Sequence, residues 1–91
     1  MRQLTIAIVF DDTFTAQPET WRAVIQLLES HGHRVICVSG RRHTMDHRME
    51  LSRALPESVP VLLSYDEPKR QFAERHGWNV DIWIDDRPEM I

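Results

Sequence analysis

The sequence predicts an α/β fold in which four parallel strands alternate with three helices. Four short apolar runs rich in β-branched residues are typical of buried strands. Apolar residues recur at helical spacing between these runs, and the connections are short. Strand–helix alternation with short connections indicates βαβ units, a parallel sheet and right-handed crossovers. The 91 residues leave room for one domain, residues 1–91.

The first strand is expected in Leu4–Phe10, an almost continuous apolar run. Such a run suits a strand covered on both faces. It stops at Asp11 and Asp12, which are costly to bury without partners. We therefore expect both carboxylates at the carboxyl end of the strand, where open α/β sheets bind their ligands.

The remaining elements follow in order. The later strands are expected to run into polar or charged residues, at Arg34–Ser39, Val59–Tyr65 and Val80–Asp85. The helices are bounded by glycine, proline or hydroxyl residues, and are expected at Pro18–Gly32, at a segment from His43 or Thr44 to Pro56, and at Glu67–His76. Residues predicted to pack in the core include Trp21, Cys37, Met45 and Met49.

Composition excludes several classes of protein. At 42% hydrophobic and 27% charged the chain is ordinary globular material, and its net charge of -3 disfavours a nucleic-acid binder. A single cysteine, Cys37, excludes an internal disulfide and fits a reducing compartment. No apolar run approaches the roughly 18 residues of a membrane span, and no signal-peptide pattern is present, so a cytoplasmic protein without a membrane segment is expected. A chain this short buries only about 60–65% of its unfolded surface, which favours self-association, for example as a homodimer.

Polar residues follow three of the four predicted strands. Paired acids follow the first and the last strand, and a serine ends the second. Because these ends share one edge of a parallel sheet, the side chains should lie close together, within reach of a lysine that begins the third helix. Carboxylates hold Mg²⁺, whereas an ammonium and a hydroxyl hold phosphate. The predicted magnesium–phosphate site comprises Asp11, Asp12, Ser39, Lys69, Asp85 and Asp86.

Two further groups of residues are weaker candidates for a functional site. His43 and His47 are four residues apart on a predicted helix and could face one way, as zinc ligands do. No third ligand stands at a suitable spacing, so a solvated helix face is the favoured interpretation. Arg41, Arg42 and Arg48 follow the serine and could contact a substrate phosphate, or they could form a charged surface loop.

Taken as an ordered set, these segments resemble the haloacid dehalogenase superfamily, most of whose members are magnesium-dependent phosphohydrolases. IAIVFDDTFT is similar to the family's first motif, and Ser39 in VICVSGR to its second. Lys69 in DEPKRQF and the acids of DIWIDDRPEM resemble the third and fourth. The resemblance covers essentially the whole chain. It implies a Rossmann-like three-layer sandwich with strand order 3-2-1-4 and a phosphate held by Ser39 and Lys69. It also implies a Mg²⁺ cofactor held by the backbone carbonyl of Asp11 and by Asp85, with Asp86 in support.

The first motif departs from the family pattern, Asp-x-Asp-Gly-Thr. Aligning Asp11–Thr13 on Asp-Gly-Thr makes Asp11 the general acid/base, puts Asp12 in place of the glycine and leaves Val9 at the nucleophile position. Asp tolerates a left-handed backbone better than most residues. Loss of a nucleophile can cost on the order of 10⁴–10⁶ in rate.

A second alignment makes Asp11 the nucleophile, with Thr13 two residues later, similar to the Asp-Lys-Thr-Gly-Thr signature of P-type ATPases. A two-residue shift keeps the facing of the side chains. The long match of IAIVFDDT to the family's strand and turn favours the first alignment.

The chain also lacks the insertions that form a cap over small substrates in this family. A capless site is open, so exclusion of water would need a macromolecular substrate or a partner chain. The leading hypothesis is a phosphohydrolase-type domain with weak or no turnover on a phosphorylated substrate. The alternatives are an active phosphatase that uses Asp11, and a non-enzymatic module that binds a protein partner.

Overall fold

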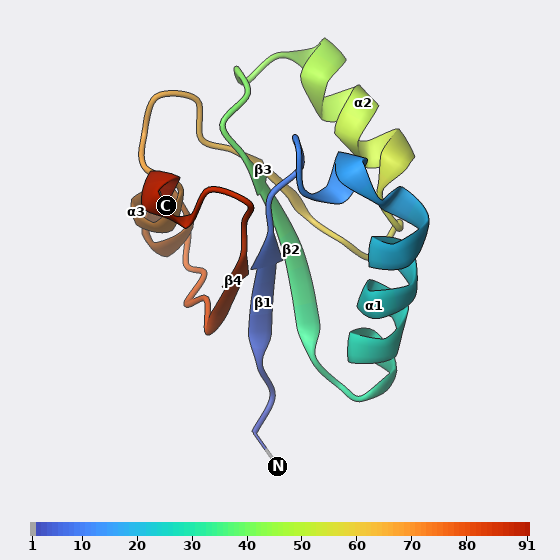
Figure 1. Cartoon of the computed structure of the whole chain (residues 1–91). Helices are drawn as coiled ribbons and strands as arrows, with labels where there is room; N and C mark the ends of the chain where they lie inside the picture. Colours follow the sequence, from blue (N-terminus) through green and yellow to red (C-terminus); the bar gives the residue numbers. More distant parts are fainter. Residues whose placement is uncertain (1) are drawn as a thin grey trace.

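A computed structural model describes residues 2–91 and has the predicted sheet (Figure 1). Its four strands are all parallel and lie in the order β3-β2-β1-β4. In this order β1 lies inside the sheet and pairs with β4, which forms one edge. The strand bounds are Thr5–Ile8 for β1, Arg34–Ser39 for β2, Val61–Leu63 for β3 and Ile82–Ile84 for β4.

Helices cover both faces of the sheet, so the fold has three layers. Figure 1 shows α1 and α2 on one side of the sheet and α3 on the other. No helix within residues 2–91 has the length and apolar character needed to cross a membrane. The helix bounds are Pro18–Ser30 for α1, Met45–Ala54 for α2 and Lys69–Arg75 for α3, with short 3-10 helices at Phe14–Ala16 and Pro88–Met90.

Alternate residues of the central strand, β1, pack into two separate cores. Ile6 and Ile8 of β1 pack in the core under α1 and α2, whereas Ala7 packs in the core under α3. The neighbouring strand β2 alternates in the same way. Burial on both faces explains why these strands are continuous apolar runs rather than alternating ones.

Three of the four strands are shorter in the structure than the sequence predicts. The first was predicted to extend to Phe10, but β1 ends at Ile8. The Val9 N–H still donates to the Ile84 carbonyl at 3.1 Å, and then the chain turns back so that the Thr15 N–H bonds to the Phe10 carbonyl. Phe10 is therefore buried but outside the strand ladder. The loop that follows β1 therefore begins at the predicted site.

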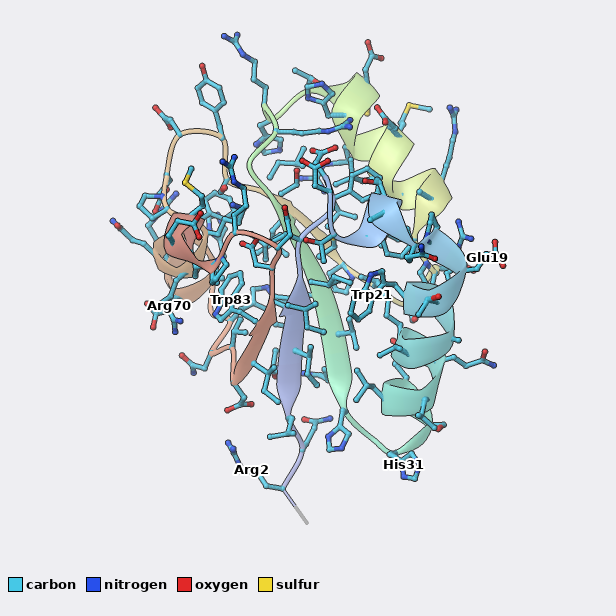
Figure 2. The ribbon with its side chains drawn as sticks, in the orientation of Figure 1. Arg2, Glu19, Trp21, His31, Arg70 and Trp83 are labelled. Atoms are coloured by element: carbon cyan, nitrogen blue, oxygen red, sulfur yellow. The ribbon has the colours of Figure 1, made fainter. Side chains whose placement is uncertain are left out.

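The prediction that Met45 and Met49 belong to the core is wrong. They are 70% and 41% exposed. The helix α2 turns Leu51 inward instead, which leaves both methionines on its solvent face. The predictions for Cys37 and Trp21 are confirmed. Cys37 is fully buried, and Trp21 packs against the core from α1 (Figure 2).

Candidate functional site

The segments that carry the four motifs line a single pocket at the carboxyl ends of β1, β2 and β4. Its volume is about 160 Å³. The pocket collects the chemistry that the sequence predicted there, although the segments are far apart along the chain. Its lining includes Val9, Asp11, Asp12, Ser39, Lys69, Asp85 and Asp86.

The floor of the pocket is formed where the first strand ends. Val9 is 4% exposed, and its backbone lies next to β4 because its N–H bonds to Ile84. Its carbonyl accepts a hydrogen bond from the Phe14 N–H at 3.2 Å, which closes the loop over the strand end. Within this loop Asp12 has φ +65°, the left-handed conformation predicted as tolerable for it.

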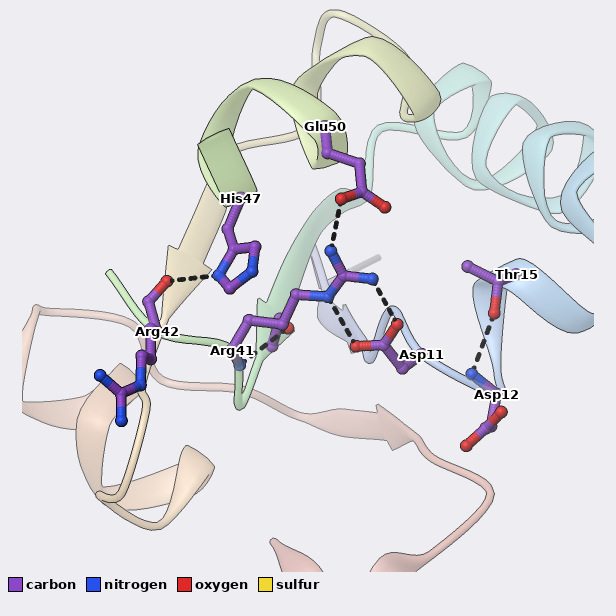
Figure 3. A network of polar contacts seen from close by, with 8 residues as sticks. Asp11, Asp12, Thr15, Arg41, Arg42, His47 and Glu50 are labelled. Carbon is purple, nitrogen blue, oxygen red and sulfur yellow. Dashed lines mark hydrogen bonds and ion pairs between the residues drawn. The ribbon is translucent and has the colours of Figure 1, made fainter. Parts of the chain in front are cut away.

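Asp11 is engaged by an arginine from the neighbouring strand end (Figure 3). Its Oδ2 and Oδ1 accept hydrogen bonds from Nε and Nη2 of Arg41 at 2.9 and 2.8 Å. A third donor, Nη1 of Arg41, reaches Glu50 of α2 at 2.7 Å. These bonds to Asp11 and Glu50 raise the pKa of Arg41 above its ordinary value, so the guanidinium stays charged. Asp11 thus lines the pocket as half of a bidentate ion pair.

Thr13 and Asp86 hold the first and last strand ends together. The Thr13 hydroxyl donates to Asp86 Oδ1 at 2.6 Å and accepts from the Asp86 backbone N–H at 3.0 Å. Thr13 is 6% exposed, so its side of these two hydrogen bonds is shielded from solvent. One oxygen of Asp86 is therefore occupied by a structural contact, which the sequence did not indicate.

Asp85 differs from Asp86 in its freedom to bind a ligand. Its Oδ1 accepts a hydrogen bond from the Arg87 N–H at 2.8 Å. Its Oδ2 is buried and has no hydrogen-bond partner among residues 2–91. A buried carboxylate oxygen without a partner is costly unless a ligand, an ion or a water completes it.

Ser39 and Lys69 bring a hydroxyl and an ammonium to the same pocket. Ser39 is 2% exposed, and its Oγ accepts a hydrogen bond from the Arg41 N–H at 3.2 Å. Lys69 is half-buried at the first residue of α3. Within the described part of the chain its ammonium makes no hydrogen bond or ion pair, so it can bind an anion without first losing a partner.

The contact between Arg41 and Asp11 is the feature that sequence analysis missed. The sequence indicates either a contact with substrate phosphate or a charged surface loop for Arg41, and neither includes a pair with Asp11. A signal existed, because Arg41 comes two residues after the end of a strand that neighbours β1. The ion pair nevertheless depends on the path of a long side chain across 30 positions of sequence.

Of the remaining arginines and histidines, Arg87 lines the pocket, whereas the other candidates named from the sequence do not. Arg48 donates to the Val61 carbonyl at 3.1 Å and contacts His43 Nε2 at 3.2 Å. Nδ1 of His47 lies 3.1 Å from the Arg42 carbonyl. Across residues 2–91 no three His, Cys, Asp or Glu side chains gather as metal ligands, so the zinc alternative finds no support.

The same finding limits how Mg²⁺ could bind. Both side-chain oxygens of Asp11 are held by Arg41, and Val9 offers no side-chain ligand. The unpartnered Oδ2 of Asp85 nevertheless has the hard-oxygen chemistry that Mg²⁺ prefers. Mg²⁺ is commonly bound by one or two carboxylates, waters and a substrate phosphate. The residues therefore fit an ion shared with a bound phosphate, and do not fit a site made by the protein alone.

Comparison of the chain with protein-family models, with curated proteins and with solved structures finds no match. The function must therefore be inferred from the geometry of the pocket.

Proposed function

We propose that this protein is a phosphate-binding domain of the haloacid dehalogenase type that binds a phosphorylated ligand with Mg²⁺ and hydrolyses it slowly or not at all. The observation that carries the proposal is the composition of the pocket. It combines Ser39, Lys69 and Asp85 with a buried valine, Val9, at the end of the central strand. The groups that hold a phosphate are thus present, and the side chain that would attack it is missing.

The backbone of the first loop supports Val9 as the residue at the nucleophile position. In that alignment Asp12 takes the place of the glycine in Asp-Gly-Thr, and glycine is the residue that most readily adopts positive φ. Asp12 has φ +65°. The alignment that makes Asp11 the nucleophile offers no reason for this conformation.

In the proposed complex the phosphate lies between Lys69 and the ends of the strands. The Lys69 ammonium neutralises part of its charge, and the Ser39 hydroxyl donates to one of its oxygens. Asp85 would hold Mg²⁺, which supplies further positive charge to the phosphate oxygens when bound. The pocket opens to solvent without a cap, which suits a ligand that extends beyond it.

The alternative of an active phosphatase that uses Asp11 requires a free carboxylate. The bidentate contact with Arg41 occupies both oxygens of Asp11 and lowers their nucleophilicity. This contact favours a phosphate-binding domain with little or no turnover over an active phosphatase. A cytoplasmic location remains part of the proposal, because the lone thiol fits a reducing compartment.

The test is hydrolysis of p-nitrophenyl phosphate with Mg²⁺ by the wild type, Val9→Asp and Val9→Asn. We expect the wild type and Val9→Asn to stay near the rate without enzyme, and Val9→Asp to exceed Val9→Asn by at least about tenfold, because a restored carboxylate can attack phosphorus. Val9→Asn is the matched control, since it has the shape of aspartate without the charge. Circular dichroism checks that both variants fold, because Val9 is buried.

The proposal also requires binding, which is measured by calorimetric titration of the wild type and Lys69→Ala with inorganic phosphate in Mg²⁺. Weaker binding by Lys69→Ala supports it. Turnover by the wild type that Asp11→Asn abolishes would show an active phosphatase instead. If the folded wild type neither binds phosphate nor hydrolyses the ester, the phosphate site itself is refuted, and a protein-binding module becomes the better hypothesis.

A further inference from the structure

We infer, on the basis of the proposed function, that the phosphorylated ligand is a nucleoside monophosphate whose base stacks on Tyr65. A second hollow, of about 600 Å³, adjoins the phosphate pocket, and Gly40, Lys69 and Met90 line both. The phosphate pocket has room for roughly five waters, which is enough for a phosphate group but not for a whole nucleotide. The second hollow is in the size range of small-molecule sites.

Tyr65 lines the second hollow in an unusual conformation. Its φ is +55°, a region that favours glycine or asparagine, and it is 49% exposed. A bulky residue that is held there while exposed suggests that the ring serves a function. Folding alone would be served better by a smaller residue at this position.

A guanidinium lies over the Tyr65 ring, as in a cation–π pair. The Cζ atom of Arg42 lies 5.0 Å from the centroid of the Tyr65 ring. Arg42 makes no ion pair within residues 2–91, and Figure 3 shows its guanidinium pointing away from the cluster of Arg41 and Asp11. Aromatic rings and guanidinium planes are the surfaces on which proteins stack unpaired bases.

Gly40 leaves the passage between the two hollows open. A Cβ atom built at this residue would meet only the Tyr65 carbonyl oxygen, at an ordinary contact distance of 3.8 Å. The backbone conformation at Gly40 is not in the left-handed region, so a side chain would be tolerated by the fold. It would instead occupy space that a ligand spanning both hollows needs.

The charges of the second hollow select among nucleotides. Asp66, Glu67 and Glu89 line it. Arg75 binds both oxygens of Glu67, so the charges of Asp66 and Glu89 are the ones that oppose a second phosphate, which disfavours diphosphates and polynucleotides. Carboxylates also accept hydrogen bonds from ribose hydroxyls and base amino groups, which an aryl phosphate such as phosphotyrosine lacks.

The test is titration of the protein with AMP, ribose 5-phosphate and inorganic phosphate in Mg²⁺, followed by calorimetry. Stacking should make AMP bind about tenfold more tightly than ribose 5-phosphate. Tyr65→Asn, which suits the left-handed backbone, and Gly40→Val should each remove this difference. Leu27→Asn, which removes an exposed apolar side chain from α1 and lines neither hollow, should keep it.

The outcomes separate this inference from the function on which it depends. If ribose 5-phosphate and inorganic phosphate bind but AMP binds no more tightly, the nucleotide is refuted and the phosphate site stands. If none of the three binds, both are refuted. If phenyl phosphate gains as much affinity as AMP does, the nucleoside monophosphate is overturned in favour of an aryl phosphate. If ADP or a 3′-phosphorylated oligonucleotide binds more tightly than AMP, it is overturned in favour of that ligand.

Discussion

At the scale of single residues, Val9 and Arg41 determine what the end of β1 offers the pocket. Val9 is a buried apolar residue, so its side chain brings no reactive group there. Asp11 remains, but Arg41 binds both of its oxygens. Under the proposed function, the pocket therefore has no carboxylate at position 9 and no free carboxylate at position 11.

Cys37 provides a prediction at this scale. Burial, reinforced by the negative charge of Asp11, raises the pKa of its thiol to about 12. Because the thiolate is the reactive form, Cys37 should not react with Ellman's reagent in the native protein at pH 8 and should react fully in guanidinium chloride. Rapid reaction without denaturant would show that β2 opens readily.

At the scale of elements, the pairing of β1 with β4 is fastened at both ends. At the amino end, Asp81 Oδ2 accepts a hydrogen bond from the Thr5 N–H at 2.8 Å, and its Oδ1 pairs with Arg2 at 2.9 Å. At the carboxyl end, Thr13 and Asp86 exchange two hydrogen bonds. These contacts support an edge strand of only three residues, Ile82–Ile84.

The contact at Asp81 predicts a pH dependence of stability. The hydrogen bond from Thr5, and then the contact with Arg2, lower the pKa of Asp81 from 3.8. The unfolded chain therefore binds the proton more readily, and the stabilisation is present above pH 3.8 and lost as the pH falls below it.

Urea unfolding of the wild type and Asp81→Asn should differ at pH 7, with the wild type more stable, and converge in acid. Glu57→Gln, which removes an exposed carboxylate in a turn, is the control and should follow the wild type. A difference between wild type and Asp81→Asn that is the same at every pH would contradict this assignment.

At the scale of the whole molecule, the sheet brings distant segments of sequence to one edge. The parallel topology and the positions of the strands could be predicted because they depend on local patterns, namely apolar runs, helical spacing and acids after strands. The exact strand ends could not, since three of the four strands are shorter than predicted. The convergence on one pocket followed from topology. The pairs of Arg41 with Asp11 and of Thr13 with Asp86 could not be predicted, because they depend on side-chain paths across gaps of 30 and 73 positions.

The Thr13 contact predicts a loss of stability in the whole fold. Thr13→Val keeps the side-chain volume but removes the hydroxyl, which leaves the Asp86 N–H without its acceptor. Such a loss costs about 1–3 kcal/mol, and in a domain of this size each 1 kcal/mol lowers the melting temperature by about 4–8 °C.

Differential scanning calorimetry of Thr13→Val measures the effect. Thr20→Val, an exposed substitution on α1, should leave the melting temperature within about 2–4 °C of the wild type, because surface changes are usually within about 0.5 kcal/mol. Equal melting temperatures for Thr13→Val and the wild type would mean that this contact adds nothing to stability.

The strand order also has a consequence for synthesis on the ribosome. The central strand β1 emerges first, but its partner β4 follows many residues later, with 73 positions between Thr13 and Asp86. At about 5–20 residues per second, roughly 4–15 s pass between these two residues. During this interval one edge of β1 is unpaired and open to aggregation. The nascent chain should therefore be a better chaperone substrate than the folded domain, and the pocket cannot form until Asp86 has been synthesised.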